Sequence, residues 1–410
     1  TAERQFDHHL LHQVTYDTLL KAERRLGHGA AARWLSERTQ GRGAEFLAMT
    51  GEHAERAGEL ALAIDCFEQA GVEARKRFAN AAAQAWLRRA VVLLAESDPR
   101  RRFALLQRLE ALADVIGDRP QQDLLHAEMA ALLDRHPDDE DRARLLFDRM
   151  LLADRRGDFA TARRLAGQCF DLAERCGAAH PAALSQSELA WLKLQIDGDA
   201  RGALPHVETA LQWAARIPDG PDGLRATTEA QLLSRSAQLS MALGRHVAAR
   251  ATLLDVLSRG EALASPQLQI SALLFLSSLA EQVGRWDESA ALAERIAALA
   301  RAAGQRQMVG KAFGILARAA AGQGDAAATL RWRAQALEIS RAVGDRYFEA
   351  FLLKGLGMAS LELGEAAAAL DWHLRSKAAF EAIGLAFKVL ESRVDIALCR
   401  AGLGDLGSAL

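Results

Sequence analysis

Few residues of this 410-residue chain have the types and spacing that catalysis or ligand binding requires. The segment most similar to a phosphate-binding loop is Gly304-Gln305-Arg306-Gln307-Met308-Val309-Gly310-Lys311-Ala312. A Walker loop has four residues between its glycines and a Ser or Thr after the lysine, whereas this segment has five residues and Ala312. We therefore reject a nucleotide-binding loop. We expect Gly304 to end a helix and Lys311 to face solvent or a groove.

Metal and nucleophile chemistry has equally little support. His8 and His12 are four residues apart and could share a helix face, as in two-histidine zinc sites, but the sequence fixes no third ligand, so structural histidines are the favoured interpretation. No Ser-His-Asp or Cys-His grouping stands at a defined spacing. The cysteines form no CxxC pair and are expected to be ordinary buried thiols of a reducing compartment: Cys66, Cys169, Cys176 and Cys399. The sequence thus predicts a chain that is not an enzyme, with no catalytic residues, no metal site and no cofactor.

Charge and composition narrow the classes of partner and of fold. The 51 basic and 53 acidic residues give a net charge of −2, which disfavours nucleic-acid binding. No charge-free stretch of about 18 residues and no apolar leader are visible, which predicts a cytoplasmic protein with no membrane partner. The chain has 85 Ala but only 23 Val and Ile together and 8 Pro, a composition that favours an all-α fold.

The elements that must position any binding residues follow an internal repeat. A glycine followed by a polar residue recurs about every 40 residues, as expected of a repeat protein: Gly157-Asp158, Gly198-Asp199, Gly244-Arg245, Gly284-Arg285, Gly324-Asp325, Gly364-Glu365 and Gly404-Asp405. The spacing is constant from Gly244 onward, and halfway between the later members stand Gly304, Gly344 and Gly384. A turn at each full and each half repeat predicts a repeating hairpin of two helices, A and B.

A second series of residues predicts how the two helices of each hairpin pack. Five residues after each turn glycine, including Gly58, stands a small residue: Ala63, Ala162, Ala203, Ala249, Ser289, Thr329, Ala369 and Ala409. Eight residues before the later glycines stands a large apolar one: Leu276, Leu316, Leu356 and Ile396. Small side chains let two helix axes approach closely, so these positions are expected to be buried between helices A and B.

These patterns resemble the tetratricopeptide (TPR) repeat. Leu356-Gly357 in helix A, the Gly-Asp turns, the aromatic residues Phe159 and Trp286 two positions after a turn glycine, and the small residues of helix B all fit, although the repeat unit is longer than the usual TPR unit. The resemblance implies a right-handed α-solenoid of about nine hairpins over residues 41–410, regular from 244 and less regular over 77–156. Its concave surface would bind a protein, a peptide or a small effector.

Residues 1–40 do not fit the repeat. The run from Phe6-Asp7-His8 through Val14-Thr15-Tyr16 and Arg24-Arg25 to Trp34-Leu35 resembles the C-terminal part of the winged-helix region of STAND-type signalling ATPases. Glu52 to Gly58 resembles the first TPR helix of that family. The resemblance implies that the TPR array is a sensor arm acting on the protein's own NTPase module, in a family often fused to class III adenylate or guanylate cyclases or to transcriptional regulators. Any ATPase or cyclase domain would lie outside this chain, whose two ends both look like internal positions of a longer protein.

The TPR resemblance also places a candidate groove on the inward positions of the A helices. These positions are polar in the middle and basic toward the C-terminal end: Gln231, Ser234, Gln238, Ser271, Ser278, Glu281, Gln282, Lys311, Arg318, Lys354 and Met358. Such a surface would suit an acidic peptide or a charged effector, and the alternative is a solvated face with no ligand. Trp332 and Trp372 occupy equivalent positions on successive B helices, and we favour core packing over an exposed aromatic ladder.

The sequence therefore predicts a non-catalytic interaction or sensor scaffold for signal transduction. The leading interpretation is the regulatory TPR arm of a larger STAND ATPase, of which cyclase linkage is one form. The alternative is an independent TPR adaptor that binds a partner peptide or protein without any NTPase.

Overall fold

The computed structural model describes residues 14, 16–37, 43–94, 98–220 and 223–405, and every regular element among them is an α-helix. The helices form two compact units, residues 1–112 and 113–410. The predicted boundary near residue 40 falls in residues 38–42, outside the described residues, as do His8, His12 and Ala409. None of the described helices is both long and apolar enough to span a membrane.

The first unit contains the helices up to most of α6, whose last turn belongs to the second unit. Its helices are α2 (Lys21–Ser36), α3 (Ala44–Ala57), α4 (Leu60–Lys76), α5 (Asn80–Leu94) and α6 (Pro99–Ile116). Helix α2 packs on α3, where His28 Nδ1 lies 2.8 Å from His53 Nδ1 and the Tyr16 hydroxyl lies 2.8 Å from His28 Nε2. Burial lowers the pKa of both histidines, so the neutral pair is favoured at this contact.

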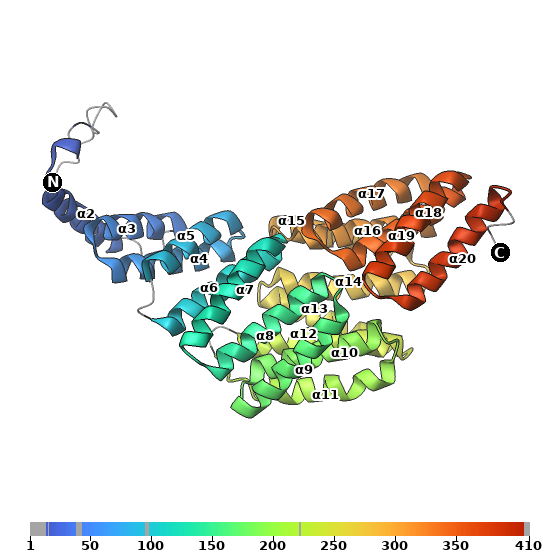
Figure 1. Ribbon diagram of the computed structural model, residues 1–410, viewed down its shortest axis with the longest axis horizontal. Coiled ribbons are helices and arrows are strands. Elements are labelled where there is room, and N and C mark those ends of the chain that lie inside the picture. The colour runs from blue at the N-terminus through green and yellow to red at the C-terminus, as the bar shows by residue number, and fades with distance from the viewer. Residues whose placement is uncertain (1–13, 15, 38–42, 95–97, 221–222, 406–410) are drawn as a thin grey trace. The chain divides into compact units, whose positions relative to one another are not determined.

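The second unit is a row of antiparallel hairpins that can be followed by colour from teal to red in Figure 1. After α7 (Arg119–Arg135), each A helix has an even number and is followed by its B helix, while α20 is the A helix before Gly404. These helices are α8 (Asp139–Arg155), α9 (Phe159–Cys176), α10 (Ala179–Gln195), α11 (Ala200–Ala214), α12 (Leu224–Ala242), α13 (His246–Ala262), α14 (Pro266–Gln282), α15 (Trp286–Ala302), α16 (Arg306–Gly322), α17 (Ala326–Val343), α18 (Arg346–Glu362), α19 (Ala366–Ala382) and α20 (Ala386–Gly402).

In the Gly-Asp turns, the glycine ends one helix and the aspartate caps the next. Gly324 has φ +79°, the left-handed conformation that ends helix α16, and the next N–H, of Asp325, donates to the Ala320 carbonyl at 2.9 Å. The Asp325 carboxylate then accepts a hydrogen bond from the Ala328 N–H at 2.9 Å and so caps helix α17. The same cap is formed by Asp118, Asp158, Asp199 and Asp345.

Packing between helices A and B follows the predicted series of small residues. The described members are all buried, with Ala369 completely inaccessible to solvent and Thr329 1% exposed. The large residues of helix A, Leu276, Leu316 and Leu356, are buried as well. The predicted TPR-like α-solenoid is thus confirmed as the fold.

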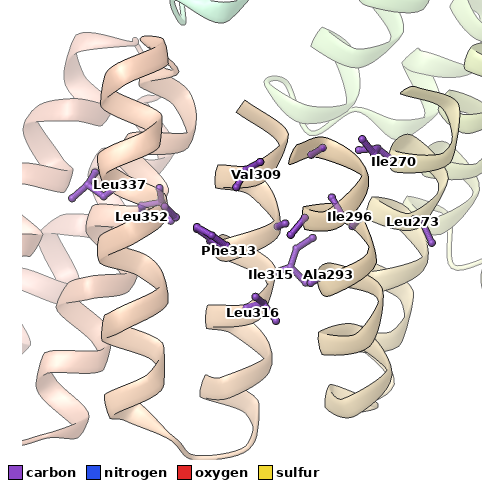
Figure 2. Close-up of a cluster of buried hydrophobic side chains, with 14 of the residues drawn as sticks. Ile270, Leu273, Ala293, Ile296, Val309, Phe313, Ile315, Leu316, Leu337 and Leu352 are labelled. Carbon is purple, nitrogen blue, oxygen red and sulfur yellow. The ribbon is translucent and has the colours of Figure 1, made fainter. Parts of the chain in front are cut away.

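Apolar clusters join successive hairpins into a continuous core. One cluster spans α14 to α18, and Figure 2 shows α16 in its middle, with Phe313 directed toward the side of Leu352 and Ile315 toward the side of Ile296. Trp332 and Trp372 are half-buried and pack against this cluster, with the Trp332 ring centroid 5.2 Å from that of Phe313. Among the cysteines, Cys66, Cys169 and Cys399 are buried as expected, but Cys176 in the last turn of α9 is exposed.

The less regular stretch contains a slip in the phase of the repeat. The interval from Gly58 to Gly157 amounts to about two and a half repeats, so one helix too many or too few separates the two glycines. The division between the two units falls inside this interval, at residues 112 and 113.

Candidate functional site

A cavity of about 530 Å³ lies within the second unit, and we call it the A-helix cavity. Six A helices contribute to its lining, namely α8, α10, α12, α14, α16 and α18. In an α-solenoid the A helices form the inner surface, so this cavity is the concave side of the array.

The array returns on itself beside the cavity. Phe380 and Ile383 of the hairpin α18–α19 share one apolar cluster with Met150 of α8 and Phe159 of α9, and we call this cluster the seam. The backbone of Gly157 comes so close to Ile383 that an added Cβ would lie 2.6 Å from its Cγ2.

Polar contacts reinforce the return of the array next to the seam. The Arg119 guanidinium at the start of α7 donates from Nε to the carbonyl of Val343, the last residue of α17, at 3.3 Å. The same guanidinium donates to Asp114 at 2.6 Å. Hairpins that are distant in sequence therefore bracket one cavity.

Five of the eleven predicted groove residues line the A-helix cavity: Gln238, Ser271, Ser278, Lys311 and Arg318. The structure brings these five together from α12, α14 and α16. Gly304 has φ +64° and ends helix α15, and Lys311 faces the groove, as expected for the segment that resembles a phosphate loop.

The other six predicted residues lie elsewhere. Gln231 and Gln282 are exposed, Met358 is 48% exposed, and the buried Ser234 hydroxyl donates to the Ala230 carbonyl of its own helix. Glu281 accepts a hydrogen bond from the Arg318 Nε at 2.9 Å. Lys354 forms ion pairs with Glu391 at 2.6 Å and Asp395 at 3.4 Å, so the basic C-terminal end of the predicted groove is neutralised by this chain's own carboxylates.

Several cavity residues were not predicted from the sequence: Asp154, Arg155, Glu188, Trp191, Arg235, Asp345 and Tyr347. Glu188 stands ten residues before Gly198, as Ser234 does before Gly244 and Lys354 before Gly364. The predicted groove includes Ser234 at this position but does not include the equivalent residue of the preceding hairpin. Applying the same position to that hairpin would have predicted Glu188. Asp154 and Arg155 reach the cavity from the last turn of α8, and no pattern within the repeat indicates that.

Charged groups dominate the part of the cavity near α8 and α10. Burial raises the pKa of the Glu188 carboxyl to about 7, and the adjacent Asp154 carboxylate adds to that effect. Burial also raises the pKa of Asp154 despite the nearby Arg155. Burial disfavours the charged form of Arg155, but the carboxylates of Asp114 and Asp154 outweigh it and raise the pKa of Arg155.

The part of the cavity near α12 and α16 carries cations. Burial lowers the pKa of Lys311 and of Arg235. Asp345, the N-cap of α18, accepts hydrogen bonds from the Gln307 side chain at 2.8 Å and from the Phe348 N–H at 3.0 Å. Within the described ranges, no three side chains of His, Cys, Asp or Glu are grouped so that they could hold a metal ion.

A second cavity, of about 650 Å³, lies in the first unit, between α4 and α6. Its central carboxylate, Glu68, is bound by Arg101 at 2.7 Å and also by Arg108. Because its central carboxylate is already paired, this cavity has less to offer a basic ligand than the A-helix cavity.

Comparison with known proteins supports the fold. No family model and no curated protein sequence matches the chain. A Rap protein complexed with competence and sporulation factor has a similar structure, with 13% identity and a TM-score of 0.55 over 80% of this chain and 99% of that one.

Two further solved structures are similar over most of this chain. A STAND protein with a tetratricopeptide repeat sensor from Pyrococcus horikoshii has 12% identity and a TM-score of 0.48, over 88% of this chain and 54% of that one. Yeast Tom70 has 11% identity and a TM-score of 0.42, over 89% of this chain and 90% of that one. At these identities the similarity extends to the fold alone, a TPR-like solenoid.

Proposed function

We propose that the chain is a protein-interaction scaffold whose A-helix cavity binds a peptide or an extended segment of a partner protein. The observation that carries this proposal is the lining of one concave cavity by six successive A helices, with aromatic, amide, hydroxyl and charged side chains together. This mixture of side chains suits a peptide, because the peptide backbone donates and accepts hydrogen bonds and the peptide side chains make both apolar and charged contacts. The Rap protein of similar fold is complexed with competence and sporulation factor, which agrees with such a use.

The larger context that we favour is the regulatory arm of a STAND signalling ATPase. This part of the proposal rests on the sequence pattern between Phe6 and Gly58. The alternative is an independent adaptor, and the A-helix cavity would bind its partner in the same way in both cases. A regulatory arm also requires that the ligand has different affinities for two states of the complete protein.

Binding to a random peptide library displayed on a surface tests the scaffold function. We expect the chain to select a set of related peptides, and Ser278→Tyr to abolish their binding because Ser278 lines the cavity and the new ring would take up part of its volume. Ser258→Tyr is the matched control, since Ser258 is exposed on the B helix α13. Selection of no peptide, or equal loss of binding in both variants, would refute the proposal.

A further inference from the structure

Two carboxylates in the A-helix cavity have oxygen atoms that lack a donor. Glu188 is only 8% exposed, and among the described residues no donor reaches its Oε1 atom or the Oδ1 atom of Asp154. A buried carboxylate oxygen without a hydrogen bond is costly. A ligand that brings donors to this point would satisfy both oxygens at once.

Aromatic rings stand beside these carboxylates. Trp191 lies one turn beyond Glu188 on α10, and its ring centroid is 6.2 Å from that of Tyr347 on α18. Both rings line the cavity that Asp154 and Glu188 line. The faces of Trp and Tyr rings attract cations, so this end of the cavity favours an ammonium or guanidinium group over a neutral donor.

The opposite charge is available on α12 and α16. Arg235 donates to the Gln238 side chain at 2.7 Å. Neither Arg235 nor Lys311 is within ion-pair distance of a described carboxylate, although Glu188 and Asp154 attract Arg235, and Asp345 and Asp154 attract Lys311, at longer range. The remaining cations of the cavity are neutralised, Arg155 by Asp114 and Asp154 and Arg318 by Glu281. Within the part of the chain that the structure describes, Arg235 and Lys311 are thus the cavity cations without a contact ion pair, and an anionic group of a ligand can provide one.

We infer that the A-helix cavity binds a peptide segment that carries both a basic and an acidic group. Asp154 and Glu188, with Trp191 and Tyr347, hold the basic group, and Arg235 and Lys311 hold the acidic one. This inference rests on the proposed peptide-binding function and specifies its ligand. It differs from the purely acidic peptide that the sequence suggested, because the basic residues nearest the C-terminus are already paired.

Matched pairs of small probes test the two halves separately. N-acetyl-arginine N-methylamide and its citrulline analogue have nearly the same shape and differ in charge, and N-acetyl-glutamate N-methylamide and its glutamine analogue do the same for the anion. Binding to the whole chain is measured by saturation-transfer NMR. We expect each charged probe to bind about tenfold more tightly than its neutral analogue.

Variants then assign each probe to its residues. Glu188→Gln and Asp154→Asn should remove the preference for arginine over citrulline and leave the preference for glutamate intact. Lys311→Gln and Arg235→Gln should do the reverse. Glu174→Gln, an exposed site on α9, is the control and should change neither preference. Circular dichroism shows whether each variant is folded. Because two variants test the basic-group site and two test the acidic-group site, each site can still be tested if one variant fails to fold.

Two results would overturn the inference. One is equal binding of the charged and neutral probes, or no binding of any of them. The other is the same loss for both charged probes in every cavity variant, which would indicate a general structural effect. The peptide library separates these failures from failure of the scaffold function: peptides selected without a basic and an acidic residue, yet lost in Ser278→Tyr, would leave peptide binding intact and refute only the inference.

Discussion

At the level of single residues, one turn of the solenoid lacks the glycine that its neighbours have. The turns between hairpins at Gly304, Gly344 and Gly384 place glycine in the left-handed conformation, and position 264, one full repeat before Gly304, holds Ala264 with φ +46°. The hydrogen bonds of the turn are nevertheless the same, since the Ser265 N–H donates to the Gly260 carbonyl at 2.8 Å as the Gln305 N–H does to Ala300. Ala264 therefore carries backbone strain that the glycines at the equivalent turns Gly304, Gly344 and Gly384 avoid.

Ala264→Gly should relieve this strain. We expect the free energy of unfolding to increase by about 0.5–1 kcal/mol, because the relief of a left-handed alanine exceeds the extra chain entropy of glycine in the unfolded state. Urea unfolding followed by circular dichroism measures the change. The converse substitution, Gly304→Ala, should decrease stability by a similar amount. A decrease in stability for Ala264→Gly would contradict this account of the turn.

The buried carboxyl of Glu188 predicts a dependence of stability on pH. Its pKa of about 7 in the folded chain lies above its ordinary value of 4.5, so between these values the folded state binds more protons than the unfolded state. Stability therefore decreases as the pH rises through this window. Glu188→Gln removes this titration. We expect the change in unfolding free energy caused by the substitution to be more favourable at pH 8 than at pH 4.5, by on the order of 1–3 kcal/mol. The exposed Glu174→Gln should show no such difference in thermal unfolding at the two pH values.

At the level of the elements, sequence reasoning succeeds where local chemistry decides the outcome. Glycine conformation and Asp caps depend on a few neighbouring residues, so the turns and the two-helix unit could be predicted from spacing. The small residues of helix B, such as Ala162 and Ala369, could be predicted because each hairpin repeats the same close contact. Even Cys176 is exposed for a local reason, since it ends α9 next to the turn at Gly177.

The close contact between helices A and B gives a prediction with an internal control. Ala369 on α19 has no solvent exposure, whereas the adjacent Ala368 is exposed on the same helix. Ala369→Leu should destabilise the chain by about 1–3 kcal/mol, because the larger side chain has no room between the helices. Ala368→Leu makes the same replacement on the same helix, so it changes composition and helix propensity in the same way, and it should change stability little. Equal melting temperatures for the two variants would show that the packing register is wrong.

The candidate site was less predictable than the helices because ion pairs between neighbouring elements decide which groups are free. Lys354 occupies an inward position of the repeat, yet Glu391 and Asp395 of α20 neutralise it. Lys311 occupies another inward position and has no contact ion pair, because Asp345, the carboxylate that acts on it most strongly, is engaged by Gln307 and by the cap of α18. Spacing along one helix shows which residues face inward but not which partners reach them.

For the molecule as a whole, the decisive feature is the return of the second unit on itself. Residues of α8 and α9 meet residues of α18 and α19 in the seam, although the hairpins from α10 to α17 separate them in the chain. A constant rotation between hairpins predicts a curved array, but the number of hairpins needed for closure depends on small angles that the sequence pattern does not reveal. Asp154 and Arg155 therefore enter the cavity only through tertiary structure.

The seam should couple hairpins that are distant in sequence, and Ile383→Asp tests this coupling. Ile383 is 6% exposed in the seam, and a carboxylate buried there without a partner would separate the two sides. We expect faster hydrogen exchange in α8 and α9 as well as in α18 and α19, while α12 and α13 keep their protection. Leu363→Asp is the control, because Leu363 is 45% exposed at the end of α18 and should change exchange near its own turn only. Exchange in Ile383→Asp that changes only near residue 383 would show that the array stays in place without the seam, whereas faster exchange in α8 and α9 would identify closure as a property of the intact solenoid.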